Sequence, residues 1–135
     1  MLTEPISNAL SGPMRAASLA SAHWKVRATV PLADARRIYV ARTYAYVAAK
    51  GEGLVILDVK NPRSPRIFQK VTLDGTLNDA EDVIVGTTNA SLFAYVADGR
   101  NGMKVLQLTS PDSPRNFYGF SPAPVPELIA WAKTP

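Results

Sequence analysis

Short apolar runs alternate with clusters of turn residues over most of the chain, from residue 34 to residue 121. Each run is four to eight residues long and rich in Val, Ile, Tyr and Phe, a composition that favours strands. No run in this region has the period of an amphipathic helix. The pattern therefore predicts eight short strands, over residues 38–42, 44–49, 54–59, 66–73, 82–85, 92–97, 103–109 and 115–120.

The predicted strands fall into two copies of one pattern. Residues 45–48 match residues 94–97 at an offset of 49, and ten of the twenty-two positions from 45 to 66 are identical at that offset without a gap. Upstream of Val40 the offset is 45, so the second copy carries about four extra residues near 87–90. An insertion between two paired strands predicts a longer hairpin loop there, with the core register unchanged.

Turn residues punctuate both copies at the same places. The glycines of 50–53 and 98–102 supply the positive φ angles of tight hairpins, and we predict equivalent backbone positions for Gly53 and Gly102. Prolines then end strand pairing before each fourth strand. A period of about 45 residues with four strands is the spacing of β-propeller blades. We therefore predict an all-β fold of two four-stranded antiparallel propeller blades, as part of a propeller or of one that an oligomer completes.

The same residues resemble a known repeat. Tyr46-Val47-Ala48, residues 53–59, Asn61-Pro62 and Pro65 are similar to the LVIVD repeat of bacterial surface and secreted proteins, and residues 54–58 read Leu-Val-Ile-Leu-Asp. The second copy is similar over residues 95–99, 102–108 and 111 but has Lys104 and Gln107 in place of an apolar residue and the aspartate. The resemblance covers about residues 34–121. It implies a propeller fold and, in many members, an extracytoplasmic setting; it implies no shared activity.

The flanks complete the expected organisation. We predict a flexible leader over 1–23, two blades within 24–121 (about 34–73 and 79–121), and a proline-rich tail over 122–135. Residues 24–32 are expected to be the outer strand of a preceding blade, and residues 127–133 to be a short helix or part of a disordered tail. The chain is thus expected to start inside a propeller. The leader does not read as a signal peptide, and no apolar stretch approaches the length of a membrane span.

Composition and charge narrow the function classes. Hydrophobic residues make up 47% of the chain and charged residues 19%, as in globular proteins. The net charge is +4, but the fifteen Lys and Arg are spread out, the one tight basic group being Arg36-Arg37 with Arg42 nearby. Without a nucleic-acid reading motif, no nucleic-acid partner is expected. The chain has no cysteine, which excludes disulfides, thiolate metal sites and cysteine nucleophiles.

Candidate chemistry is sparse. His23 is the one histidine, which excludes a centre of several histidines within one chain, and we interpret it as a surface residue. The acidic residues of 79–82 and the loop 98–102 suit either cation binding or hydrogen-bonded turns, and we interpret both as turns. We predict no catalytic, cofactor-binding or metal-binding residues and no cofactor. The candidate loop or channel contacts are Arg42, Asp79, Glu81, Asp82, Asp98, Arg100 and Asn101.

Three functional hypotheses follow. The first is a noncatalytic interaction module, a propeller segment of a larger extracytoplasmic bacterial protein, which binds a protein or small ligand through its loops. The second is part of an enzyme whose channel site is completed by other blades. The third is a structural, self-assembling repeat. Because two blades leave apolar faces bare, we expect additional blades or a homo-oligomer. The predicted core positions are Val47, Ile56, Leu57, Val96, Val105 and Leu106.

Overall fold

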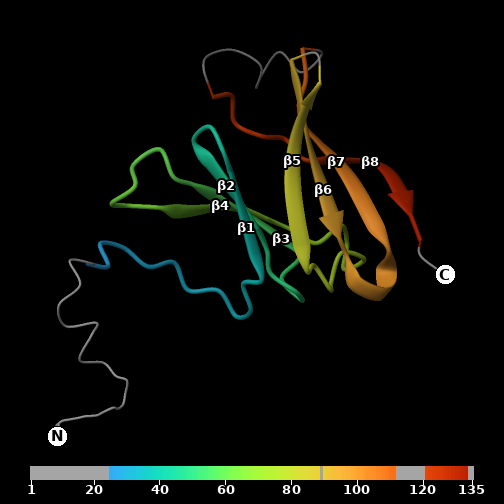
Figure 1. Ribbon diagram of the computed structural model, residues 1–135, viewed down its shortest axis with the longest axis horizontal. Coiled ribbons are helices and arrows are strands. Elements are labelled where there is room, and N and C mark those ends of the chain that lie inside the picture. The colour runs from blue at the N-terminus through green and yellow to red at the C-terminus, as the bar shows by residue number, and fades with distance from the viewer. Residues whose placement is uncertain (1–24, 89, 112–120, 134–135) are drawn as a thin grey trace, which may run out of the picture.

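Two four-stranded antiparallel sheets make up the structure (Figure 1). The computed structural model describes residues 25–88, 90–111 and 121–133. The first sheet contains β1 (Arg37–Ala41), β2 (Tyr44–Ala48), β3 (Leu54–Asp58) and β4 (Arg66–Val71), hydrogen-bonded in that order. The second sheet contains, likewise in order, β5 (Asp82–Thr88), β6 (Ser91–Ala97), β7 (Met103–Thr109) and β8 (Glu127–Ala132). A single 3₁₀ turn, η1 (Gly99–Asn101), precedes β7.

The two sheets repeat one strand register, which confirms the predicted duplication. Tyr46 of β2 lies opposite Tyr39 of β1, and its counterpart Tyr95 of β6 lies opposite Ile84 of β5. Gly53 and Gly102 both have positive φ, 75° and 88°, and each stands directly before the third strand of its sheet. A Cβ at Gly53 would lie 2.3 Å from the carbonyl oxygen of Val71, and one at Gly102 would lie 2.2 Å from that of Ala132. The equivalence predicted for these two glycines is therefore confirmed.

The insertion in the second copy lengthens strands and not the loop. β1 and β2 have five residues each, whereas β5 and β6 have seven, and Thr87 and Thr88 are paired with Leu92 and Ser91. The longer hairpin loop predicted over 87–90 is thus wrong. Two extra residues in each arm extend the antiparallel ladder, because paired backbone groups satisfy their hydrogen bonds while a longer loop would leave them to water.

The fourth strand of the second sheet comes from beyond the proline-rich segment. The strand predicted over 115–120 falls outside the described residues, and β8 occupies the place beside β7. The helix expected over 127–133 is wrong. β8 pairs with β7 as β4 pairs with β3, including a register shift at equivalent positions, between Ile56 and Leu57 and between Val105 and Leu106. The open edge of β7 needs backbone partners, and that requirement overrides the helical propensity of Glu, Leu and Ala in this segment.

Residues 25–32 have no regular secondary structure in this chain, and their expected role as the outer strand of a preceding blade stays a prediction. Val30 and Leu32 instead pack on the first sheet, against a small cluster that contains Val47, Val55 and Leu57. Among the described residues no strand pairs with this segment, and its apolar side chains attach it to the sheet.

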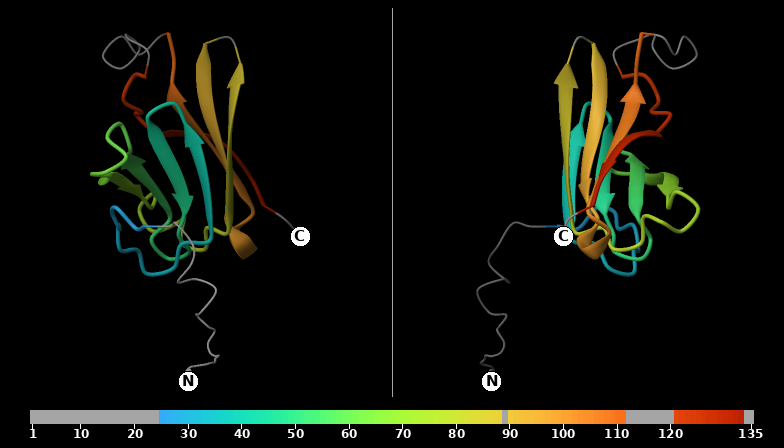
Figure 2. Two further views of the ribbon diagram at one scale, coloured as in Figure 1. Left: turned by 60° about the vertical axis from the view of Figure 1, so that its left-hand side comes forward. Right: turned by 90° about the vertical axis from the view of Figure 1, so that its right-hand side faces the viewer.

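The main core lies between the sheets, which are close together at β1 and β5 and diverge toward β4 and β8 (Figure 2). In each sheet, one side carries Tyr46 or Tyr95, here called the tyrosine face, and the other carries Val47 or Val96, the valine face. The tyrosine face of the first sheet packs on the valine face of the second, and Leu77 from the β4–β5 connection inserts between them.

Five of the six predicted core residues are buried; the prediction for Val105 is wrong. Val105 is half-buried because it points to the tyrosine face of the second sheet, which no sheet formed by the described residues covers. Its neighbours in sequence, Lys104 and Leu106, point to the valine face and are buried. The alternation of strand side chains indicates two faces but not which of them another sheet will cover.

Candidate functional site

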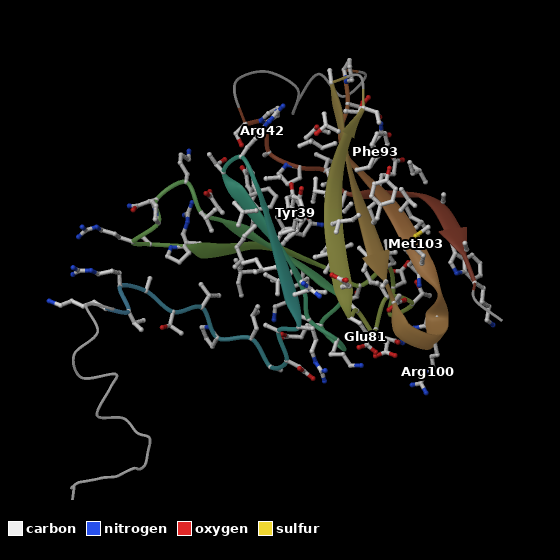
Figure 3. All side chains as sticks on the ribbon, in the orientation of Figure 1. Tyr39, Arg42, Glu81, Phe93, Arg100 and Met103 are labelled. Atoms are coloured by element: carbon white, nitrogen blue, oxygen red, sulfur yellow. The ribbon has the colours of Figure 1, made fainter. Side chains whose placement is uncertain are left out.

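Six of the seven candidate residues gather at one end of the molecule. This loop end, as we call it, consists of the β2–β3 turn (50–53), the β6–β7 turn (98–102) and the β4–β5 connection (72–81), with the adjacent end of β5. Figure 3 places Glu81 and Arg100 there and Arg42 at the opposite end, at the tip of the β1–β2 hairpin. The structure thus brings together all of the predicted contacts except Arg42.

The acidic residues of the loop end form ion pairs that join the two sheets. The Lys50 ammonium group donates to the carboxylate of Asp79 and, at 3.2 Å, to that of Glu81. The backbones of Lys50 and Ala80 also exchange two hydrogen bonds, of 2.9 and 3.2 Å. Asp82 at the start of β5 lies 3.2 Å from the Arg37 guanidinium of β1. The acidic side chains therefore serve as contacts between the two sheets.

Hydrogen bonding shifts the ionisation of the Lys50–Asp79 pair. The hydrogen bond from Lys50, assisted by the backbone amide of Arg100, lowers the pKa of Asp79. The hydrogen bonds to Asp79 and Glu81 raise the pKa of Lys50. Gly99 allows the Asp79 carboxylate to approach the β6–β7 turn, because a Cβ at that position would lie only 2.0 Å from a carboxylate oxygen.

Asp98 and Lys104 form an ion pair inside the loop end. Both side chains are almost completely buried. The Lys104 ammonium group also donates to the carbonyl oxygen of Thr76, at 3.0 Å, and the Asp98 carboxylate accepts the backbone amide of Asp79, at 2.8 Å. A buried ion pair is tolerated when further hydrogen bonds satisfy both groups, and these bonds hold the β4–β5 connection against the second sheet.

Beside this pair lies a hollow of about 520 Å³ with an exposed indole at its edge. The Asn101 side-chain amide donates to Oδ1 of Asn78, at 2.9 Å, and Nε1 of Trp131 donates to the backbone oxygen of Asn101, at 3.2 Å. Within the described part of the chain, Oδ1 of Asn101 meets no hydrogen-bond donor. The lining residues are Gly75, Thr76, Asn78, Asn101, Lys104, Leu128, Trp131 and Lys133.

The inner edge of the molecule, formed by β1 and β5, has a different chemistry. Ile38, Val40 and Ile84 are exposed on these strands, and the Arg37–Asp82 ion pair connects them. Among the residues that the structure describes, no group of three or more His, Cys, Asp or Glu side chains is arranged to hold a metal ion. No helix in the same described ranges is long and apolar enough to cross a membrane.

Of the eight residues that line the hollow, the sequence predicted one, Asn101. Lys104 carried a signal, because it is the polar residue that interrupts an apolar run of the repeat. Asn78 and Trp131 carried no such signal in the sequence. Trp131 lies in the predicted tail, and only the pairing of β8 with β7 brings it to the loop end.

Comparison with known families agrees with this geometry. The sequence model of the LVIVD repeat matches residues 33–72 and 79–115, more than half of the chain. The chain belongs to the LVIVD repeat family. Its two four-stranded sheets are therefore two β-propeller blades, with β1 and β5 as inner strands and β4 and β8 as outer strands. Comparisons with curated proteins and with solved structures give no match to this chain.

Proposed function

We propose that this LVIVD repeat protein is a noncatalytic interaction module that binds its ligand at the loop end. The observation that carries the proposal is the hollow beside Trp131, where an indole that is 61% exposed lies next to the side-chain amides of Asn78 and Asn101. A large aromatic surface left in water beside polar side chains is typical of recognition sites. The larger extracytoplasmic protein to which such a module would belong is an expectation from the repeat resemblance.

The rigidity of the loop end supports a binding role. The hydrogen bonds of Lys104 to Thr76 and of Asp79 to Asp98, with the Asn78–Asn101 bond, join the β4–β5 connection to the second blade. A scaffold that holds its contact residues in place loses less conformational entropy when a ligand binds.

The chemistry of the hollow favours a saccharide. The indole face of Trp131 suits the apolar face of a sugar ring, and Oδ1 of Asn101 suits a sugar hydroxyl as donor. Lys133 at the edge supplies a positive charge for an acidic sugar.

Tryptophan fluorescence tests the proposal directly. Trp24 and Trp131 are the two tryptophans, so Trp24→Phe leaves Trp131 as the single reporter. We expect a saturable change in its emission with neutral or acidic oligosaccharides, and at least a tenfold weaker response when Asn101→Ala is added. Asn61→Ala, at the opposite end of the molecule, is the matched amide control.

Two results would contradict the proposal in different ways. A saturable response to acidic peptides but not to oligosaccharides would overturn the ligand class and keep the site. No saturable response to either class, with Asn101→Ala behaving as the parent, would overturn the site itself.

A further inference from the structure

Each blade has one face packed in this chain and one face without a blade against it. The tyrosine face of the first blade and the valine face of the second meet in the core. Within the part of the chain that the structure describes, no blade packs on the valine face of the first blade or on the tyrosine face of the second. Because the blades are repeats, the observed interface indicates how the two remaining faces would be covered.

The tyrosine face of the second blade is apolar and open to solvent. Met103 is 41% exposed, whereas its counterpart Leu54 is fully buried at the same position of the first blade. Tyr95 is half-buried, whereas its counterpart Tyr46 is buried. The side chains of Ile84, Tyr95 and Met103 border a hollow of about 460 Å³.

The valine face of the first blade is also incomplete. Ile38 is 57% exposed and Val40 is 58% exposed, whereas their counterparts Val83 and Val85, which contact the first blade, are 1% and 9% exposed. A hollow of about 540 Å³ extends along this face.

The segment before β1 corresponds to the end of the β4–β5 connection, which lies at the existing interface between the blades, and the two segments make similar contacts. Leu32 packs on the valine face of the first blade, as Leu77, forty-five residues later, packs on that of the second. The amide of Ala33 donates to the Glu52 side chain at 3.2 Å, and the counterparts of these residues are the hydrogen-bonded pair Asn78 and Asn101. This side of the first blade is therefore shaped to receive a neighbour.

Charge is complementary across the two free faces. Arg37 of β1 and Asp82 of β5 occupy equivalent positions and pair across the existing interface. Suppose that the first blade of another copy packs on the second blade of this chain. In the new interface, Asp82 of this chain then lies where Arg37 lies in the existing interface, and Arg37 of the other copy lies where Asp82 does. Opposite charges meet again, with their order reversed.

We propose that a second copy of this chain docks the valine face of its first blade onto the tyrosine face of the second blade, in the geometry of the existing interface. Such a contact is head-to-tail, so it builds a closed ring or a filament. Propellers of 4 to 8 blades correspond to roughly two to four copies. The docking does not depend on the ligand proposed for the loop end.

Complementation between two variants tests the docking. Met103→Lys places a charge on the free tyrosine face, and Ile38→Lys places one on the free valine face; both sites are exposed, so folding should be retained. By size-exclusion chromatography with light scattering at about 10–100 µM, we expect wild-type protein to be oligomeric and each variant alone to be monomeric. A mixture of the two should give a heterodimer and nothing larger, because each pair keeps one intact interface.

Circular dichroism and the urea midpoint of each variant, compared with Lys25→Ala as an exposed control, show whether folding is retained. A monomeric wild type would overturn the proposal. So would variants that keep the wild-type mass, or a Met103→Lys or Ile38→Lys protein that dimerises with itself, since that would mean that like faces meet. Wild-type filaments that either variant abolishes would support it.

Discussion

Asp98 and Lys104 form an ion pair in the interior of the second blade, where the first blade has two apolar residues. The exposed fraction is 0% for the Asp98 side chain and 5% for that of Lys104. At the equivalent positions of the first blade, Ala49 and Val55 are buried in an apolar cluster. The same two positions of a blade therefore accommodate either an ion pair or two apolar side chains. This permits a direct test of how much the ion pair contributes to stability.

Removing one member of this pair should be costly. Asp98→Ala leaves the Lys104 ammonium group buried without its counter-ion, and we expect a loss of about 3 to 5 kcal/mol in the free energy of unfolding. The double variant Asp98→Ala/Lys104→Val reproduces the first blade, and it should recover at least half of that loss. Urea denaturation measures both values. A double variant as unstable as the single one would mean that the hydrogen bonds to Thr76 and Asp79, and not the unpaired charge, dominate.

Glycine substitutions should separate backbone strain from steric conflict. Gly53 and Gly75 both have positive φ, but a Cβ at Gly75 meets nothing within 4 Å, whereas one at Gly53 lies 2.3 Å from the Val71 carbonyl oxygen. Gly75→Ala should lower the free energy of unfolding by about 1 to 2 kcal/mol, through backbone strain alone. Gly53→Ala should cost at least about 1 kcal/mol more, because β4 must move away from β3. Equal losses in thermal or urea unfolding would contradict the close approach of Val71.

Acid should weaken the contact between the blades. Because hydrogen bonding from Lys50 lowers the pKa of Asp79 in the folded state, the stabilisation is present above the unfolded value, near 4, and is lost as the pH falls through the folded value. The raised pKa of Lys50 has the opposite pH dependence. The stabilisation by protonated Lys50 is present below the pKa of Lys50 in the unfolded state, near 10.4, and is lost as the pH rises through its pKa in the folded state.

The variant Asp79→Asn tests this pH dependence. It should lower stability at pH 7 and reduce the dependence of the urea midpoint on pH below about 4. Asp74→Asn removes the same charge at an exposed turn position and is the matched control. An unchanged acid profile in Asp79→Asn would show that other carboxylates are responsible for the acid sensitivity.

Neighbouring residues of β7 should respond very differently to truncation. Leu106 is fully buried between the blades, and Leu106→Ala should cost about 2 to 5 kcal/mol. Val105 lies on the uncovered face, so Val105→Ala should cost less than half as much when the chain is monomeric. Measuring urea unfolding at protein concentrations well below those of the association experiment keeps docking out of the comparison. Similar losses would mean that the uncovered face is packed in solution.

The sequence by itself determined the local and repeating features of this protein. Short apolar runs rich in Val, Ile, Tyr and Phe specify strands, and the match at an offset of 49 residues specifies that Tyr46 and Tyr95, or Gly53 and Gly102, occupy equivalent places. These features depend on the backbone and on nearest neighbours, so they can be read along the chain.

Only the tertiary structure decided which faces are covered and which distant segments pair. Val105 was predicted to be in the core and is half-buried, whereas Lys104 beside it is buried, because the second blade packs through its valine face. The alternation of side chains alone does not indicate which face is packed. β8 became a strand because the free edge of β7 supplies hydrogen-bond partners that no local propensity contains. Trp131 reached the candidate site only through that pairing. Burial and edge pairing are properties of the assembled chain, since they depend on residues far apart in sequence.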